Sequence, residues 1–323
     1  MAKVIKKKRE ANSEVLDDIV YINLDEYEGN YSSKKLGIRV GPGKNILELA
    51  DEDEDVYLFY QKLLTEDYMF YWHHNGVSYF IRRKYLKEIW KRTDLGDLGG
   101  LFYTVEEPLK ERSSETEKNN LIVIFSPMPA ENVKYSSNIS ARCFRTYFPN
   151  IQKYLAKNTY VLRIMDANLS YGSLYLNTSN YPNMEEDVQN IIQKIQEELN
   201  IEKERVVLYG VDNIAMSALH HGIKGDFKSV IINPYFTLEE LKESSFYDKY
   251  LSNALPNDLK ELVKNAKIEN HLIIDSKDSG HSLEELNELA RVYMLNDSVD
   301  REELVKHVTI ETSLALNKNW INI

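Results

Sequence analysis

Short apolar runs recur along the last two-thirds of the chain. Runs of this length are typical of strands buried on both faces of a sheet. They occupy residues 121–125, 160–165, 206–209, 229–232, 271–274 and 307–310. Between them, segment 185–199 carries apolar residues at helical spacing, and segment 282–294 predicts a second helix. This alternation predicts an α/β fold, in which a mostly parallel sheet is flanked by helices.

The first third of the chain has a different pattern. An acidic run at 51–55 precedes the apolar residues of 56–64, which predicts a helix with acidic residues in its first turn. Segments 68–72 and 77–81 are rich in aromatic and β-branched residues and flank Asn75-Gly76, the strongest short hairpin signal. A short basic helix is expected at 84–91. These elements predict a small α+β module.

A polar stretch at 111–120 separates the two patterns, so we expect the domain boundary there. The predicted division is a flexible N-terminus over residues 1–17, the small α+β module over 18–115, and an α/β-hydrolase-like domain over 120–323. The hydrolase-like character of the last domain depends on the motif at residues 205–220, described below.

Composition narrows the function further. The net charge of −11 argues against nucleic acid as the main ligand, because phosphate binding needs a clustered basic surface. No apolar run is long enough to predict a membrane span, and the basic residues 6–9 lack the apolar stretch of a secretory signal. Cys143 is the only cysteine, which excludes a disulfide framework and a thiolate metal site. These features predict a soluble cytoplasmic protein.

The most informative motif is the segment Arg205–His220. It begins as a buried strand, turns at Gly210 and Asp212, and continues as a helix. In serine hydrolases of the α/β class this is the place of G-x-S-x-G, with the nucleophile on the turn. Gly210 holds the first glycine position, Asp212 the nucleophile position and Ile214 the second glycine position. The sequence therefore predicts a nucleophile elbow without its serine.

Asp212 has two interpretations. Carboxylates do form covalent intermediates, as in haloalkane dehalogenases and epoxide hydrolases. Such enzymes keep small residues around the turn, however, and a bulky Ile214 is expected to crowd the crossing of strand and helix. We therefore favour a structural role, in which the carboxylate accepts hydrogen bonds from backbone N–H groups at the start of the following helix.

The acid of a triad would follow a later strand. The strand at 271–274 runs into Asp275 and Asp278. We take Asp278 as the candidate, because it lies in the loop proper, although Asp is common in such loops for turn reasons alone.

The general base is missing from its expected place. Residues 311–320, after the last predicted strand, contain no histidine. His281 is expected to cap the next helix, His307 lies at the wrong end of its strand, and His220 and His221 lie about two turns into the elbow helix. A serine-type relay is therefore not expected.

Other kinds of site are not indicated. The chain has no G-x-G-x-x-G after a strand and no Walker glycine–lysine loop, and Gly41-Pro42-Gly43 is an isolated turn. Neighbours on a strand point to opposite faces, so His73 and His74 cannot easily share one ion. We expect no cofactor and no metal.

From about residue 55 onward the chain resembles the XcbB/CpsF family of capsular polysaccharide biosynthesis proteins, which are bacterial proteins with an α/β-hydrolase-like domain. In general pattern this family is related to the acyl-transferring component of accessory secretion systems. The segments that carry the resemblance are Leu121–Met128, Leu162–Asp166 with Gly172–Thr178 after it, Val207–Val211 and Asn317–Asn319.

The resemblance implies that several catalytic positions have changed. Family members with an intact site carry a Tyr-Gly-x-Ser-Lys-Gly-Gly type elbow and a C-terminal His-Ser. The serine falls on Asp212, the glycines fall on Ile214 and Ala215, and the histidine falls on Thr312, while the acid position, Asp278, is retained. The resemblance therefore implies a hydrolase fold whose serine chemistry has been lost.

Three functions remain open from the sequence. The first is a degenerate hydrolase that acts by binding in a bacterial surface-polysaccharide or glycoconjugate pathway, with a protein partner or the glycan as ligand. The second is an esterase or acyltransferase that uses Asp212, or less plausibly Ser217, as nucleophile. The third is a structural subunit without a ligand. The aromatic residues of the N-terminal module offer a contact surface, although core packing explains them equally well: Tyr68, Phe70, Tyr71, Trp72, Tyr79 and Phe80.

Overall fold

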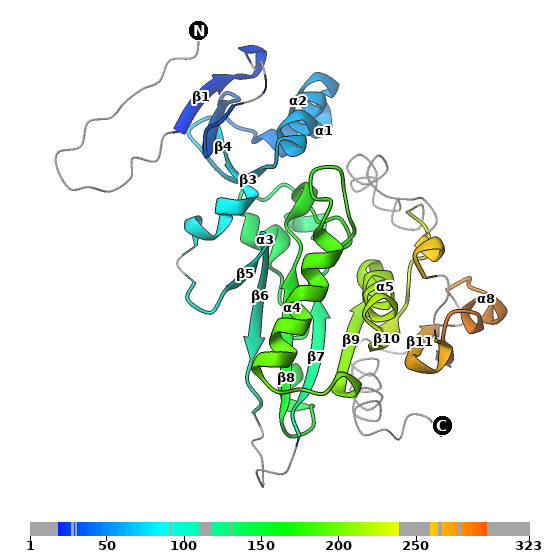
Figure 1. The fold of residues 1–323 in the computed structure, drawn as a ribbon. Coiled ribbons are helices and arrows are strands. Elements are labelled where there is room, and N and C mark those ends of the chain that lie inside the picture. The colour runs from blue at the N-terminus through cyan, green and yellow to red at the C-terminus, as the bar shows by residue number, and fades with distance from the viewer. Residues whose placement is uncertain are drawn as a thin grey trace.

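Two β-sheets organise the chain in the computed structural model (Figure 1). The structure describes residues 19–26, 29, 31–90, 92–109, 118–129, 131–238, 259–263, 267–276 and 279–295. The predicted flexible terminus and the strand expected at 307–310 lie outside these residues. No helix in the described ranges is long and apolar enough to cross a membrane.

The smaller sheet belongs to the N-terminal module and has the order β1-β2-β4-β3. Its strands are β1 (Ile19–Asn23), β2 (Lys35–Arg39), β3 (Tyr68–His74) and β4 (Val77–Arg82). Helices α1 (Ile46–Glu52) and α2 (Glu54–Thr65) accompany it, as the upper part of Figure 1 shows. The predicted hairpin is confirmed, because β3 and β4 pair antiparallel around Asn75 and Gly76.

Local capping explains where these helices begin. The Asn45 side chain accepts hydrogen bonds from the backbone N–H groups of Leu47 and Glu48. The Glu48 carboxylate in turn accepts one from the backbone N–H of Asn45, which completes a capping box. Asp53 caps α2 in the same way, by accepting from the backbone of Asp55 and Val56. The acidic run at 51–55 is thus divided between two helices: its first two residues end α1, and its last three cap and begin α2, as its charge predicted.

The larger sheet has eight strands in the order β12-β11-β10-β9-β7-β8-β6-β5. Its central strands pair parallel from β12 to β8, whereas β6 is antiparallel to both β8 and β5, so the sheet is mixed. The strands are β5 (Gly96–Leu98), β6 (Leu101–Glu106), β7 (Asn120–Phe125), β8 (Thr159–Met165), β9 (Val206–Val211), β10 (Lys228–Ile232), β11 (His271–Ser276) and β12 (Arg291–Leu295).

Helices cover this sheet, which confirms the α/β class. The α-helices are α3 (Ile139–Cys143), α4 (Met184–Glu198), α5 (Ala215–Gly225) and α8 (Leu283–Asn287). The 3-10 helices are η1 (Leu24–Glu26), η2 (Arg83–Ile89), η3 (Glu131–Val133), η4 (Ile151–Lys153), η5 (Asn168–Ser170), η6 (Lys203–Arg205), η7 (Asp212–Ile214), η8 (Leu259–Val263) and η9 (Ile268–Asn270).

Both faces of the large sheet are buried. Along β9, Val206 and Leu208 belong to the core that contains α4 and α5, whereas Val207 and Tyr209 belong to a second core on the opposite face. Successive residues of a strand point to opposite faces, so a strand with apolar residues at every position needs a core on each side. This is why the apolar runs in the sequence are continuous.

Two sequence-based expectations differ from the structure. Segment 282–294 is not one helix: α8 ends at Asn287, and β12 follows and pairs with β11. Arg291–Leu295 contains β-branched and aromatic residues, and the open edge of β11 offers it backbone partners. In addition, β5 and β6 lie before the boundary expected at 111–120 yet pair in the large sheet, so that boundary does not separate the two sheets.

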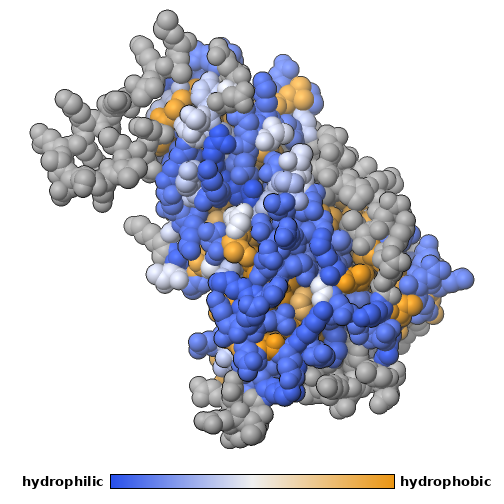
Figure 2. Space-filling view, in the orientation of Figure 1, coloured by the Kyte–Doolittle hydropathy of each residue, from blue (hydrophilic) through white to orange (hydrophobic). Residues whose placement is uncertain are grey.

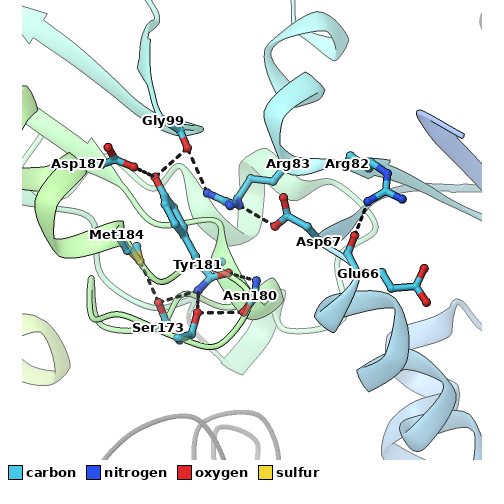
Figure 3. Close-up of polar contacts among 12 residues, drawn as sticks. Glu66, Asp67, Arg82, Arg83, Gly99, Ser173, Asn180, Tyr181, Met184 and Asp187 are labelled. Atoms are coloured by element: carbon cyan, nitrogen blue, oxygen red, sulfur yellow. Dashed lines mark hydrogen bonds and ion pairs between the residues drawn. The ribbon is translucent and has the colours of Figure 1, made fainter. Parts of the chain in front are cut away.

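An arginine joins the N-terminal module to the large sheet (Figure 3). Arg83 Nε donates to Asp67 Oδ1 at 2.8 Å, and Arg83 Nη1 donates to the carbonyl of Gly99, between β5 and β6, at 3.3 Å. Its guanidinium carbon lies 3.4 Å from the ring centre of Tyr181, just before α4. The planar cation therefore holds three segments at once, which a lysine ammonium cannot reproduce.

A second set of contacts lies deeper in the same interface. Arg142 of α3 is fully buried, and its Nη2 donates to the carbonyl of Phe70 in β3 at 2.5 Å. The hydroxyls of Tyr60 and Ser170 are hydrogen-bonded to each other. Polar groups at such depth need partners, so these contacts fix how the module sits on the larger domain.

We expect Arg83→Lys to lower the free energy of unfolding by about 1–2 kcal/mol, because it loses the forked hydrogen bonds and the stacking on Tyr181. Arg92→Lys is the matched control, since Arg92 makes a largely exposed ion pair with Asp94. That control should change stability by less than about 0.5 kcal/mol. Urea denaturation measures both, and equal losses would contradict a special role for Arg83.

Candidate functional site

The predicted elbow is present at the carboxyl end of β9. This strand lies between β7 and β10, inside the large sheet. Asp212 follows its last residue with φ +54°, and η7 leads directly into α5. Left-handed backbone is costly for most residues but is tolerated by Asp and Asn. Asp212 thus lies on a tight turn at the edge where ligands of such sheets bind, as the sequence predicted.

Gly210 allows the strand and the helix to approach each other closely. A Cβ atom at position 210 would lie 2.6 Å from the Ile214 carbonyl oxygen, 2.7 Å from Ala218 Cβ and 2.9 Å from Ala215 Cα. No side chain fits at such distances. The first glycine of the motif is therefore required here by packing, and Ala215 and Ala218 complete the crossing.

Ile214 does not crowd the turn as we expected from the sequence. Its side chain is 1% exposed and belongs to the core that contains α5, and the atom of Ile214 that faces Gly210 is its backbone carbonyl oxygen. The 3-10 helix η7 lies between β9 and α5, so that α5 begins at Ala215. The small side chain of Ala215 then lies where the helix contacts Gly210. The absence of a second glycine therefore does not prevent an elbow.

Asn233 holds the Asp212 carboxylate. Asn233 follows β10, and its Nδ2 donates to Asp212 Oδ1 at 2.9 Å. The backbone N–H of Asn233 donates to the carbonyl of Ile274 in β11, also at 2.9 Å. One residue thus ties together the carboxyl ends of three neighbouring strands. The N-cap position of α5 is Ile214, so the expected hydrogen bonds from the helix N–H groups to Asp212 stay a prediction.

An aspartate–histidine pair lies at the end of β11, where sequence reasoning missed it. His281 Nδ1 lies 2.8 Å from Asp275 Oδ2, and the same oxygen accepts from Ser279 Oγ at 2.9 Å. Asp275 is buried, and the His281 ring packs edge-on against Phe236 at 4.7 Å between ring centres.

The role expected for His281 as a helix cap is wrong. Ser282 caps α8, because its side chain accepts from the backbone N–H of Glu285. The signal for the pair was an aspartate on the strand with a histidine six residues later, a spacing that a loop can close. Asp278, the carboxylate chosen from the sequence, lies outside the described residues, as do His307 and Thr312.

The two histidines of α5 are structural. His221 Nε2 lies 2.9 Å from the Tyr175 carbonyl and its Nδ1 lies 3.1 Å from Gln189 Nε2, while His220 Nε2 lies 3.1 Å from Glu185 Oε2. Burial lowers the pKa of His221 to about 3, so its imidazole stays neutral. Both rings face α4 and its surroundings, as their distance along the helix suggested.

Several buried polar atoms lie close to the elbow in sequence. Within the described part of the chain, Tyr209 Oη, Asn213 Oδ1 and Ser217 Oγ have no hydrogen-bond partner. Ser217 is 2% exposed inside α5, so its hydroxyl is not presented at the sheet edge. This placement removes Ser217 as a nucleophile.

A buried carboxylate shapes the same edge on the other side of β7. Asp166 follows β8 and accepts hydrogen bonds from the backbone N–H groups of Asn168, Ser173 and Tyr175 at 2.9, 2.6 and 3.0 Å. Burial raises the pKa of the Asp166 carboxyl to about 6, although these three donors act in the opposite direction. The aspartate thereby folds the loop that follows β8 and lines the sheet edge.

These groups define what the site can do chemically. The elbow presents a carboxylate in place of a hydroxyl, and the neighbouring strand end carries a carboxylate–imidazole pair. Asp212, Asp275 and His281 follow the chain order of nucleophile, acid and histidine in α/β-hydrolases. Acyl transfer through a serine is excluded at the elbow, because position 212 holds an aspartate. The Asp212 carboxylate could instead bind a ligand or attack one as a nucleophile.

A scan against protein-family models finds no match for the chain, and a search of curated proteins finds no similar sequence. Several solved structures are similar in fold, and three of them follow. The capsule O-acetyltransferase of Neisseria meningitidis serogroup A is 17% identical, with a TM-score of 0.47 over 68% of this chain and 93% of that one.

The glycosylation associate protein (Gap123) complex from Streptococcus agalactiae is 15% identical, with a TM-score of 0.49 over 77% of this chain and 52% of that one. The fluorophosphonate-binding serine hydrolase FphF from Staphylococcus aureus is 13% identical, with a TM-score of 0.45 over 71% and 96%. TM-scores below 0.5 assign neither a family nor a function to this chain.

We expect Gly210→Ala to lower the free energy of unfolding by about 1–3 kcal/mol, because the new methyl group overpacks the crossing of β9 and α5. Urea denaturation followed by circular dichroism measures this loss. Stability equal to that of the parent would mean that strand and helix separate without cost, and would contradict the tight crossing.

We expect Asp212→Asn to keep the free energy of unfolding within about 1 kcal/mol of the parent, because Asn tolerates left-handed backbone and can still accept from Asn233. Asp212→Val should cost at least about 1–2 kcal/mol more than Asp212→Asn, since a β-branched residue is strained at this φ. Thermal and urea unfolding of the two variants check the difference, and equal stabilities would contradict the strained turn.

Proposed function

We propose that the larger domain is an α/β-hydrolase-like domain of the XcbB/CpsF type that has lost serine chemistry. It acts by binding in a bacterial surface-polysaccharide or glycoconjugate pathway, in the cytoplasm. Its ligand is a glycan of that pathway or a protein that handles the glycan. The family and the pathway follow from the resemblance of the sequence segments at residues 121–128, 162–178 and 207–211, and remain part of the proposal.

The observation that carries the proposal is the side chain at the elbow. Asp212 occupies the nucleophile position with the required left-handed backbone, and its carboxylate accepts a hydrogen bond from Asn233. An acyl group transferred to a carboxylate would form a mixed anhydride. The carboxylate is a far weaker base than the alkoxide of an ester, so the tetrahedral intermediate would expel Asp212 again. Acyl transfer from an ester is therefore disfavoured at this site.

The topology supports the hydrolase-like assignment. Numbered from β5, the strands of the large sheet run 1-2-4-3-5-6-7-8, with the second strand antiparallel to its neighbours, which is the order of α/β-hydrolases. The elbow then follows the fifth strand and Asp275 lies at the end of the seventh. Both are the places from which this fold takes its nucleophile and its acid.

A second candidate function is favoured by the Asp275–His281 pair. In this alternative Asp212 is a nucleophile that attacks a saturated carbon, so that a carbon–oxygen bond forms and the leaving group departs with its electron pair. The product is an ester of Asp212, which water hydrolyses after His281 removes a proton from it. The chain order of the three residues fits this sequence of steps.

We expect the parent protein to show no hydrolysis of p-nitrophenyl acetate above Asp212→Ala and no labelling by a fluorophosphonate probe. Asp212→Ser should also stay inactive, because residues 311–320, where this fold is expected to carry its general base, contain no histidine. Ser217→Ala is the control that identifies any labelling at that residue.

Two outcomes would change the assignment. Ester hydrolysis by Asp212→Ser but not by the parent would show that a working general base lies at the elbow. It would contradict the proposal that the domain has lost serine chemistry. For the second candidate, His281→Gln should trap the Asp212 ester, which intact mass spectrometry after incubation with a panel of terminal epoxides and alkyl halides would detect. If the mass of His281→Gln increases and that of His281→Gln/Asp212→Asn does not, the proposed binding function is contradicted and the second candidate, catalysis through Asp212, takes its place.

A further inference from the structure

The N-terminal sheet carries aromatic side chains on the face that points away from its helices. Tyr21 of β1, Gly37 of β2 and Tyr79 of β4 are direct cross-strand partners, and Tyr79 is in turn paired with Trp72 of β3. Residues opposite each other in a sheet point to the same side. The row Tyr21, Gly37, Tyr79 and Trp72 therefore crosses all four strands.

The helices lie on the other face. The backbone N–H of Ile46, the first residue of α1, donates to Ser78 Oγ at 3.1 Å, and Ser78 alternates with Tyr79 along β4. Leu36 and Ile38, on either side of Gly37, are fully buried in the core. Trp72 is 49% exposed, which is high for a tryptophan.

Gly37 makes this face flat. A Cβ atom at position 37 would lie 2.8 Å from two carbons of the Tyr21 ring, so the ring lies over the glycine backbone. The Tyr21 and Tyr79 rings are 6.4 Å apart, and the Tyr79 and Tyr71 rings are 6.5 Å apart. Three tyrosine rings thus follow one another across the sheet, and the ring of Tyr21 covers the backbone of Gly37.

The charge of this sheet differs from that of the chain. Strands β1–β4, all of whose residues are described, contain Lys35, Arg39 and Arg82 and neither Asp nor Glu. The chain as a whole has a net charge of −11. Arg39 is exposed on the same face as Gly37; its guanidinium carbon lies 5.6 Å from the Tyr21 ring centre and its Nη1 lies 3.5 Å from Asn23 Oδ1. A cation with no carboxylate beside it on the sheet favours an anionic ligand.

We propose that this face, defined by Tyr21, Gly37, Arg39, Tyr71, Trp72 and Tyr79, binds an acidic glycan chain. The proposal rests on the proposed function and names the class of glycan and the place where it binds. Sugar rings present C–H groups on their faces, which pack on the electron-rich faces of aromatic rings. Arg39 supplies the planar donor that carboxylate and phosphate groups need. The visible surface of the described residues is mostly hydrophilic, with small scattered apolar groups (Figure 2).

The chemistry favours a glycan over a single-stranded nucleic acid. A nucleic acid would place a phosphate beside every base, and its affinity would come from several clustered cations. On this face Lys35 and Arg39 are the cationic side chains of β2, and the remainder of the chain is strongly acidic. A sugar polymer that carries a negative charge only on some of its residues fits a face with few cations beside a row of aromatic rings.

Binding of the full-length protein to defined polymers tests the proposal. The probes are oligogalacturonate and oligosialic acid, which carry carboxylates, a phosphodiester-linked sugar polymer, neutral dextran, and poly(U). We expect at least one acidic sugar polymer to bind, measured by calorimetry, with dextran and poly(U) at least tenfold weaker. The carboxylate and phosphodiester arms distinguish the two sources of negative charge.

Variants locate the binding to the face. Tyr79→Ala and Arg39→Gln should each weaken binding at least tenfold, whereas Tyr79→Phe should retain most of it because the ring remains. Tyr154→Ala is the matched control, since Tyr154 is 55% exposed elsewhere in the molecule. Far-ultraviolet circular dichroism of each variant verifies that the module is folded.

The possible outcomes separate this proposal from the proposed function. If no acidic sugar polymer binds, or if poly(U) binds more tightly, the acidic-glycan proposal is overturned. If an acidic polymer binds but Tyr79→Ala and Arg39→Gln do not weaken it, this face is excluded while glycan binding by the protein stands. Esterase activity of the parent protein would overturn the proposed function and leave binding at this face unaffected.

Discussion

The geometry of the candidate site depends on the close approach of β9 and α5 at Gly210. A side chain there would overlap Ile214, Ala215 and Ala218, so only glycine lets the helix start directly behind the strand end. That approach forces a sharp reversal of the chain, and Asp212 absorbs it with left-handed backbone. The side chain at this position is consequently held at the sheet edge, whatever its chemistry. The elbow is thus a packing constraint first, and a catalytic device only when it carries a nucleophile.

The fixed elbow organises the groups around it. Asn233 donates to Asp212 through its side chain and to Ile274 through its backbone, so the ends of β9, β10 and β11 form one hydrogen-bonded unit. Asp275 directly follows Ile274 and binds His281. A change at position 212 therefore acts on a connected polar edge, in which the side-chain amide of Asn233 donates to the carboxylate and orients it but cannot act as a general base.

Sequence patterns predicted the elements whose causes are local. The hairpin follows from Asn75-Gly76, the start of α2 follows from Asp53, and the central strands follow from continuous apolar runs. β12 was predicted as the end of a helix over 282–294; its strand conformation comes from pairing with β11, which the sequence does not show. β5 and β6 were not predicted, and their residues were counted with the small module, since only sheet pairing reveals their place in the large sheet.

The candidate site was predictable to a similar extent. Gly210 and Asp212 were identified because a motif fixes their spacing, whereas the Asp275–His281 pair depends on how one loop closes. The effect of Ile214 was misjudged, because a 3-10 turn inserted before α5 transfers the close contact to Ala215. A bulky residue at a glycine position of the motif therefore shows that the sequence differs from the motif. It does not show that the backbone conformation differs as well.

The nucleophile position and the glycine position of the elbow are constrained by different physical terms. Replacing a serine by aspartate removes acyl chemistry at once, yet it preserves the fold because Asp is tolerated at the left-handed position. Replacing Gly210 would damage the domain itself. A hydrolase-like domain that comes to serve binding can therefore lose its nucleophile without losing its elbow. If the domain acts by binding, as proposed, affinity comes from surfaces such as the aromatic face of the N-terminal sheet, where rings and a cation are already arranged before any ligand arrives.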